Sequence, residues 1–156
     1  MQYVSSSPLL SPSTALGLYP PFLLMNVKIK SCSPNLTSFV AILPLTFLSR
    51  NPGGVMFGGY QACLADPIPA LACNRLFPDF SSWTKSVKCN MVKAGTTDLT
   101  LTFNFPNETE RSIRKDLDAR GYSNPKFTYN YTLEDGTVAT ECECVVAIRK
   151  KGYVRV

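Results

Sequence analysis

A glycine-rich loop followed by an isolated carboxylate is the part of the 156-residue sequence whose residue types could do chemistry. The loop at 51–59 ends in the pair Gly58-Gly59, and Asp66 follows in an apolar stretch. Glycines that open a helix let a ligand approach the free backbone N–H groups, which together with the helix dipole can hold an oxyanion or a phosphate. A carboxylate in apolar surroundings is costly unless it has a role, such as that of a general base or nucleophile.

Both features also have a purely structural interpretation. The glycines can simply form a tight turn, and Asp66 precedes Pro67, which is a common way to start a helix with an N-cap and a proline at the first position. The sequence contains no histidine, which excludes Ser-His-Asp and Cys-His chemistry. Acid–base catalysis would therefore use a carboxylate, a lysine, a tyrosine or a thiol.

The six cysteines do not form a recognisable metal motif, because no C-x-x-C pair is present and no histidine can complete a mixed site. Cys142 and Cys144 are two residues apart, which places both on one face of a strand. We expect all six to be reduced and mostly buried, and we expect no metal and no cofactor.

The net charge of +5 comes from scattered basic residues, apart from the run Arg149-Lys150-Lys151. This distribution does not predict nucleic-acid binding. Charged residues make up only 17% of the chain, which suits a protein that buries surface against a second copy of itself. The absence of a basic leader and of a full membrane span predicts a cytoplasmic protein without a membrane partner.

The pattern of the chain predicts one domain over 13–150, with a flexible tail at 1–12 and a C-terminal tail at 151–156. A helix at 60–77 has almost no polar face, so we expect it to be buried. Pro67 and Pro69 remove two N–H groups from it and predict a kink or split at 64–67. The other expected elements are an N-terminal helical segment at 13–24, a helix at 107–120, and strands at 27–31, 39–43, 82–92, 98–105, 126–133 and 137–149.

Two local patterns support the second half of this assignment. Asn107 and Glu110 have the spacing of a capping box at the start of the helix over 107–120. Asp135-Gly136 between two alternating segments predicts a β-hairpin. Together the elements predict an α+β fold in which an antiparallel sheet wraps around a long apolar central helix, with a second short helix and an N-terminal helical segment. This is the hotdog arrangement.

The loop and the helix after it resemble the hotdog thioesterase superfamily, and especially its phenylacetyl-CoA thioesterase group. The shared pattern is an asparagine, a His/Phe-Gly-Gly loop and a helix aspartate, here Asn51, Phe57-Gly58-Gly59 and Asp66. The match is closer to an uncharacterised thioesterase-like subfamily that also has Leu-Tyr-Pro-Pro near its start, here at 18–21, and Asp-Pro in the helix. The resemblance covers residues 16 to 150.

This resemblance implies roles for individual residues. The N–H of Gly58, helped by Gly59, would polarise a thioester carbonyl, Asp66 would be the nucleophile or general base, and Asn51 would position the attacking water or the thioester. Phe57 stands where many active members have histidine. Near the place of a serine or threonine on the next strand lies Trp83, flanked by Ser82 and Thr84, so we name Phe57, Trp83 and Thr84 with Gly59 as substrate-binding candidates.

Spacing adds a constraint on the assembly. Asp66 comes eight residues after Gly58, about 12 Å along a helix, so one thioester cannot reach both within one chain. Two subunits must share the site, which predicts a homodimer or a dimer of dimers. The alternatives to hydrolysis are a non-catalytic hotdog protein that binds acyl-CoA or fatty acid, and a purely structural role. For the phosphates of CoA the candidate cations are Lys85, Lys88 and the run at 149–151.

Overall fold

The computed structural model describes residues 12–153. Its sheet is seven-stranded and antiparallel throughout, in the order β1-β2-β4-β6-β7-β3, with the short β5 paired to β7. The strands are β1 Lys28–Cys32, β2 Ser38–Leu43, β3 Phe80–Met91, β4 Leu99–Asn104, β5 Tyr122–Ser123, β6 Lys126–Thr132 and β7 Val138–Lys150. The helices are α1 Pro12–Gly17, α2 Pro20–Leu24, α3 Gly58–Ala65, α4 Pro67–Leu76 and α5 Asn107–Arg120.

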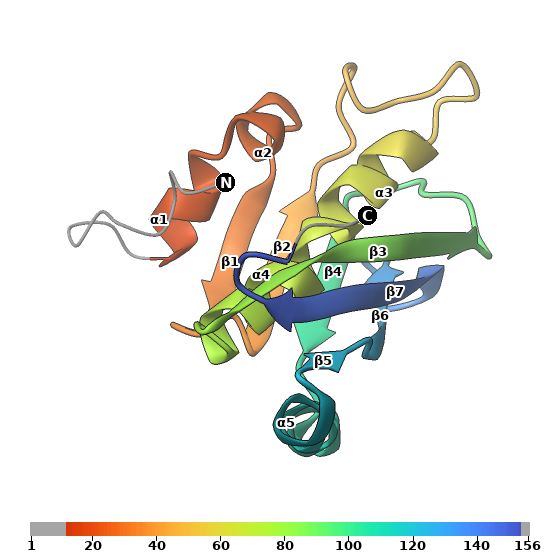
Figure 1. The fold of residues 1–156 in the computed structure, drawn as a ribbon. Coiled ribbons are helices and arrows are strands. Elements are labelled where there is room, and N and C mark those ends of the chain that lie inside the picture. The colour runs from red at the N-terminus through yellow and green to blue at the C-terminus, as the bar shows by residue number, and fades with distance from the viewer. Residues whose placement is uncertain (1–11, 154–156) are drawn as a thin grey trace.

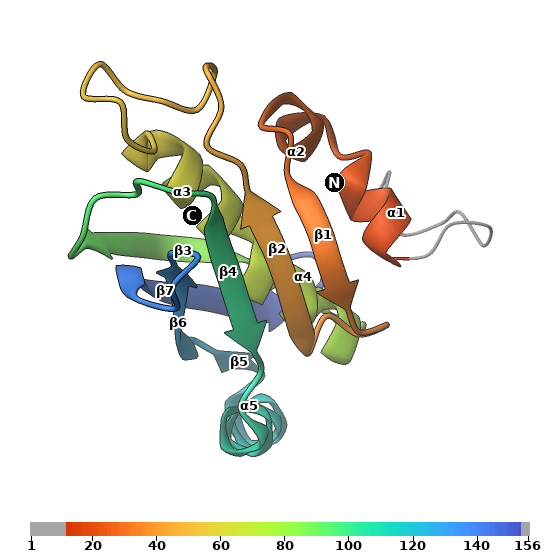
Figure 2. The same cartoon turned by 180° about the vertical axis from the view of Figure 1, so that it is seen from behind.

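The sheet curves around α3 and α4, which lie between its β1–β2–β4 part and its β3–β7 part (Figures 1 and 2). Leu64, Ile68 and Ala72 bring the apolar side of these helices to the core and are fully buried. Leu101 and Phe103 of β4 are equally buried on the sheet side. The predicted α+β fold, a sheet around an apolar central helix, is therefore confirmed.

The central helix divides as its prolines predict. α3 ends at Ala65, α4 begins at Pro67, and Asp66 lies at the break. Asp66 keeps helical backbone angles, with φ −50° and ψ −54°, so the axis continues while the hydrogen-bond ladder is interrupted.

The helix over 107–120 has the predicted bounds, but the capping box is wrong. Pro106 has the extended conformation of an N-cap, its carbonyl accepts the N–H of Glu110, and no side chain caps the helix. Asn107 is thus the first helical residue, one position too late to cap. On this helix Glu110 pairs with Arg114 at 2.7 Å, and Asp116 pairs with Arg120 at 2.9 Å.

The hairpin between β6 and β7 is confirmed. Gly136 has φ +82° and donates its N–H to the carbonyl of Leu133, and the side chain of Asp135 accepts the N–H of Thr137. A positive φ favours glycine, so the Asp-Gly pair forms the turn as the sequence predicts. The two-residue β5 was not predicted, because it forms only by pairing Tyr122 and Ser123 with the end of β7.

The N-terminal helical segment is divided into α1 and α2, and the pair Pro20-Pro21 marks the division, because it forms the first residues of α2. Phe22 of α2 is fully buried. The predicted tails lie mostly outside the described residues, except that Pro12 begins α1 and residues 151–153 follow β7. None of the helices within residues 12–153 is long and apolar enough to cross a membrane.

β2 is buried on one face only, although its residues 39–43 are all apolar. Phe39, Ala41 and Leu43 are fully buried. Val40 and Ile42 point to the opposite face and remain half-exposed. This pattern follows because the helices cover one face of the sheet only.

Candidate active site

Hydroxyl groups from the sheet hold the central helix at its break. The carbonyl of Ala65 would normally accept an N–H from residue 69, but that residue is a proline. The hydroxyl of Tyr129 donates to this carbonyl instead, at 2.8 Å, and the hydroxyl of Thr84 donates to the carbonyl of Asp66 at 2.8 Å. Pro69 thus frees the Ala65 carbonyl, which Tyr129 of β6 satisfies, and Thr84 of β3 adds a second bond from the sheet to the helix at Asp66.

A cavity of about 280 Å³ lies beside this break. It is mainly apolar, and α4 and β3 form most of its wall while the N-terminal segment closes one side. Its lining residues are Leu16, Tyr19, Asp66, Pro67, Ala70, Leu71, Asn74, Ser82, Trp83 and Thr84. Three predicted site residues, Asp66, Trp83 and Thr84, therefore meet at one cavity.

The carboxylate of Asp66 is half-buried in this wall and is available to a ligand. Asp66 occupies the N-cap position of α4 with Pro67 after it, as the structural interpretation expects, but its side chain makes no cap hydrogen bond. Within residues 12–153 no hydrogen bond or ion pair engages this carboxylate. An acceptor without a protein partner at the wall of a cavity can accept a proton or hydrogen bond from a bound molecule.

Ser82 supplies a second free polar group at the same cavity. Its Oγ is buried and is the one buried side-chain nitrogen or oxygen in the described part of the chain that has no hydrogen-bond partner. Its backbone is fixed, because the amide of Asn74 donates to the carbonyl of Ser82 at 2.9 Å and accepts its N–H at 2.8 Å. Buried hydroxyls are normally satisfied, so this one, on a residue that lines the cavity, is a candidate partner for a water or a substrate group.

The glycine loop forms the N-terminal end of α3, away from this cavity. Phe57 precedes the helix with an extended backbone and donates its N–H to the carbonyl of Ser49 at 2.7 Å. A Cβ on Gly58 would lie 2.5 Å from Cε of Met91, and a Cβ on Gly59 would collide with the ring of Phe57. A side chain at either position would have to displace Met91 or the ring of Phe57, and the N–H groups of both glycines, in the first helical turn, have no intrahelical acceptor.

Asn51 forms a local turn. Its N–H donates to the carbonyl of Val55 at 2.9 Å, and its side-chain oxygen accepts the N–H of Val55 at 3.3 Å. Its carbonyl accepts the N–H of Gly54. Asn51 therefore shapes the loop before Phe57 and does not line the cavity at Asp66.

Comparison with solved structures decides the fold. A protein of unknown function from Pseudomonas aeruginosa, named a probable thioesterase, superposes with a TM-score of 0.73 over 83% of this chain and 86% of its own, at 17% identity. A thioesterase of Haemophilus influenzae gives 0.66 over 90% of each chain at 13% identity. A variant of a Staphylococcus aureus thioesterase gives 0.63 over 81% and 96% at 17% identity.

The chain has the hotdog fold. No family model matches the sequence, and no curated protein matches it. At these identities the likeness establishes the architecture, and the chemistry has to be argued from the residues of this hotdog domain.

Within one hotdog domain the predicted residues separate into two groups. Asp66, Trp83 and Thr84 line the cavity at the break, whereas Gly58 and Gly59 lie at the other end of α3. The eight residues from Gly58 to Asp66 are helical up to Ala65, so the separation of about 12 Å expected from helix geometry applies.

Several residues of the cavity were not among the predicted site residues. Asn74 is positioned by the register of β3, and Leu16 and Tyr19 by the packing of the N-terminal segment, so only the tertiary structure brings them to the site. Tyr129 comes from β6, and no local pattern connects it with a helix 64 residues away.

The cysteines near the break are not poised as nucleophiles. Cys142 and Cys144 share the helix-facing side of β7, as predicted, and both are buried. Burial is the main cause that raises the pKa of the Cys144 thiol to about 11, and the negative charge of Asp66 adds to the rise. Cys144 is therefore a neutral thiol at physiological pH. All six cysteines are free, as expected, but Cys63 is exposed on α3, which was expected to be buried.

Proposed function

We propose that the chain hydrolyses an acyl-CoA thioester, with Asp66 as general base or nucleophile. The observation that carries the proposal is the cavity in which the unpaired carboxylate of Asp66 lies with the unsatisfied hydroxyl of Ser82 and with Thr84. The thioesterase names of proteins with the same fold support a thioester as the reacting group. The mainly apolar wall suits an acyl chain.

The chemistry is a proton transfer coupled to acyl transfer to water. A water molecule bonded to the Ser82 hydroxyl gives a proton to Asp66 as its oxygen attacks the thioester carbonyl. The carbonyl oxygen gains negative charge, which the N–H groups of Gly58 and Gly59 stabilise. The carbon–sulfur bond then breaks, Asp66 gives the proton to the leaving CoA thiolate and is restored as a carboxylate, and the carboxylic acid departs.

A second copy of the chain has to supply the glycines, because Gly58 and Asp66 are too far apart in one chain. The surface around α3 favours such a partner. Phe57 and Met91 are each 49% exposed, and Cys63 is also exposed, on a helix without a polar face. β3 is an edge strand of twelve residues with unpaired backbone groups on its outer side. We infer a homodimer in which β3 edges pair and the two α3 helices lie side by side.

A second candidate function is binding of acyl-CoA or fatty acid without turnover. Phe57 favours it, because this residue places an apolar ring where many related enzymes have a polar imidazole. The half-exposed ring packs over Gly59 and contacts Tyr60 edge-on at a centroid distance of 6.0 Å. It can shield a bound ligand but cannot donate a hydrogen bond to a thioester.

An acyl-CoA hydrolysis screen across chain lengths, including aryl-acetyl groups, separates the two functions. Released CoA thiol is measured against a heat-denatured control, with mass spectrometry of the purified protein to detect retained ligand. Turnover of at least one acyl-CoA supports hydrolysis. Retained or tightly bound acyl-CoA without turnover would refute hydrolysis and support the binding function.

A further inference from the structure

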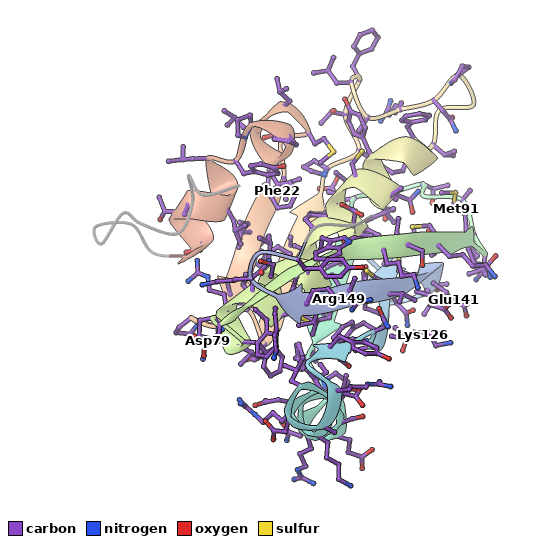
Figure 3. All side chains as sticks on the ribbon, viewed as in Figure 1. Phe22, Asp79, Met91, Lys126, Glu141 and Arg149 are labelled. Atoms are coloured by element: carbon purple, nitrogen blue, oxygen red, sulfur yellow. The ribbon has the colours of Figure 1, made fainter. Side chains whose placement is uncertain are left out.

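A cationic cleft with aromatic walls lies on the outer side of the sheet, where the ends of α5, β5 and β7 meet. Its volume is about 490 Å³, within the range of small-molecule sites. Figure 3 shows Arg149 toward the end of β7, while Met91 and Glu141 lie at the far end of the β3–β7 pair. The cleft is lined by Arg120, Gly121, Tyr122, Arg149, Lys150 and Tyr153.

Arg149 provides a fixed positive charge without a counter-charge. Its Nη1 donates to the carbonyls of Ser123 and Ile148 at 2.9 and 2.8 Å, and its Nη2 donates to Oδ1 of Asn124 at 2.8 Å. All three acceptors are neutral, and no carboxylate pairs with Arg149 among the described residues. A guanidinium has five N–H donors, so two remain free for a ligand such as a phosphate.

The other two cations add to this charge. Arg120 pairs with Asp116 at 2.9 Å, so its charge is partly compensated. Lys150 lines the cleft with its side chain over Gly121, where a Cβ would lie 2.9 Å from Cε of Lys150. Gly121 has φ +74° as the C-cap of α5, so glycine serves both the turn and the close approach of the lysine.

Two tyrosine rings frame Arg149. The guanidinium carbon lies 5.1 Å from the ring centre of Tyr122 and 5.9 Å from that of Tyr153. The two residues are 41% and 55% exposed, and the guanidinium of Arg120 also lies over the Tyr122 ring at 4.7 Å, so part of each ring remains open to solvent. Exposed aromatic faces beside cations are the combination that binds nucleotides, because a base can stack while the cations bind its phosphates.

The cleft adjoins the Asp66 cavity through one side chain. Trp83 lines that cavity, and its ring stacks on Tyr153 at a centroid distance of 6.3 Å and an interplanar angle of 21°. Lys88, by contrast, lines a hollow that also contains Glu141 and Glu143, whose carboxylates repel phosphate. The surroundings of Arg149 and Lys150 therefore suit phosphate better than those of Lys88.

We propose that the cleft formed by Arg120, Tyr122, Arg149, Lys150 and Tyr153 binds a phosphorylated nucleoside. Such a ligand has two sources, the nucleotide end of a CoA thioester or a free nucleotide. The first source rests on the proposed thioesterase function, and the second does not. The shared chemistry is a base stacked on tyrosine with phosphate on Arg149 and Lys150.

The test uses the single tryptophan of the chain, Trp83, as an internal reporter, since it stacks on a wall of the cleft. Adenosine 3′,5′-bisphosphate, CoA and inorganic phosphate are titrated against the full-length protein by fluorescence and calorimetry. The variants are Lys150→Gln and Tyr153→Leu. The matched controls Lys85→Gln and Lys88→Gln each remove one positive charge from neighbouring β3.

We expect the bisphosphate and CoA to bind more tightly than inorganic phosphate. Lys150→Gln should weaken both by about tenfold, as expected for a lost hydrogen bond to a charged group, while the two control variants stay within about twofold of wild type. Tyr153→Leu should weaken the binding of the nucleotides but not the binding of inorganic phosphate. Absence of nucleotide binding, equal affinity for phosphate alone, or equal losses in the controls would each overturn the proposal.

The kinetics of acyl-CoA hydrolysis distinguish the nucleotide end of CoA from a free nucleotide as the ligand of the cleft. If the CoA end occupies the cleft, Lys150→Gln raises KM for acyl-CoA and leaves kcat unchanged. If KM is unchanged while the bisphosphate still binds, the site takes a free nucleotide. Nucleotide binding without any hydrolysis would remove the proposed function but keep this site, whereas hydrolysis without nucleotide binding would remove the site and keep the function.

Discussion

Replacing Tyr129 with phenylalanine should destabilise the chain, because the hydroxyl of Tyr129 supplies a hydrogen bond that Pro69 cannot give. Tyr129 is 5% exposed, and its hydroxyl donates to the Ala65 carbonyl that Pro69 leaves without a helical donor. In Tyr129→Phe this buried carbonyl loses its hydrogen-bond donor, which lowers the free energy of unfolding by about 1–3 kcal/mol. For a domain of this size the thermal midpoint should fall by roughly 2–4 °C per kcal/mol.

Tyr131→Phe is the matched control. Tyr131 is fully buried and donates to the carbonyl of Gln61 at 2.7 Å, but that carbonyl keeps the N–H of Ala65 as a helical donor. The loss of free energy should therefore be smaller, about 0.5–1.5 kcal/mol. Urea unfolding of both variants measures the difference.

A double-mutant cycle with Pro69→Ala isolates the mechanism. Alanine at position 69 restores an N–H for the Ala65 carbonyl, so the cost of Tyr129→Phe should shrink in that background. Equal costs for Tyr129→Phe and Tyr131→Phe, together with an undiminished cost in the Pro69→Ala background, would refute the account of how the sheet holds the broken helix.

Three further predictions concern the surroundings of the site. Gly58→Ala places a methyl group 2.5 Å from Cε of Met91, a flexible side chain that can move, so stability should change by less than about 1 kcal/mol. The variant keeps the backbone N–H, but the methyl group should obstruct the approach of the thioester carbonyl and lower hydrolysis roughly tenfold or more; unchanged turnover would contradict the placement of the thioester against Gly58. Cys89 and Cys142 face each other across β3 and β7, with their sulfurs 3.8 Å apart. Mild peroxide should therefore join them in a disulfide with the loss of two thiols, while the exposed Cys63 is oxidised by itself. Finding all thiols still free after oxidation would contradict this prediction. CoA affinity should weaken as salt rises, because exposed charges are screened, and an affinity independent of salt would count against a cationic cleft.

The sequence predicted the fold where local physics decides the structure. The helix over 107–120 and the Asp135-Gly136 turn formed as expected, and the split at Asp66 follows from two prolines that cannot donate. The capping box failed by one residue, because Pro106 already occupies the capping position. Such an offset depends on backbone angles that the spacing of residue types does not determine.

The site was predictable only in part. Asp66, Trp83 and Thr84 meet at one cavity, as the resemblance implied. The hydrogen bond from the Thr84 hydroxyl to the Asp66 carbonyl was not predicted, because it depends on the register of β3 against the helix. The free hydroxyl of Ser82 depends on that same register, and the cleft at Arg149 on a β5 pairing that is only two residues long. Long-range pairings of this kind leave no periodic trace in the sequence.

The hydrolysis rate of Asp66→Asn tests the central claim most directly. Asparagine keeps the size of the side chain, and no cap hydrogen bond is lost because Asp66 makes none, so the variant should fold with its stability within about 0.5 kcal/mol of wild type. With the acyl-CoA that the screen identifies, we predict a rate lower by roughly 10²–10⁴-fold, as for a lost general base. An equally folded variant that hydrolyses the same acyl-CoA as fast as wild type would show that Asp66 is not the catalyst.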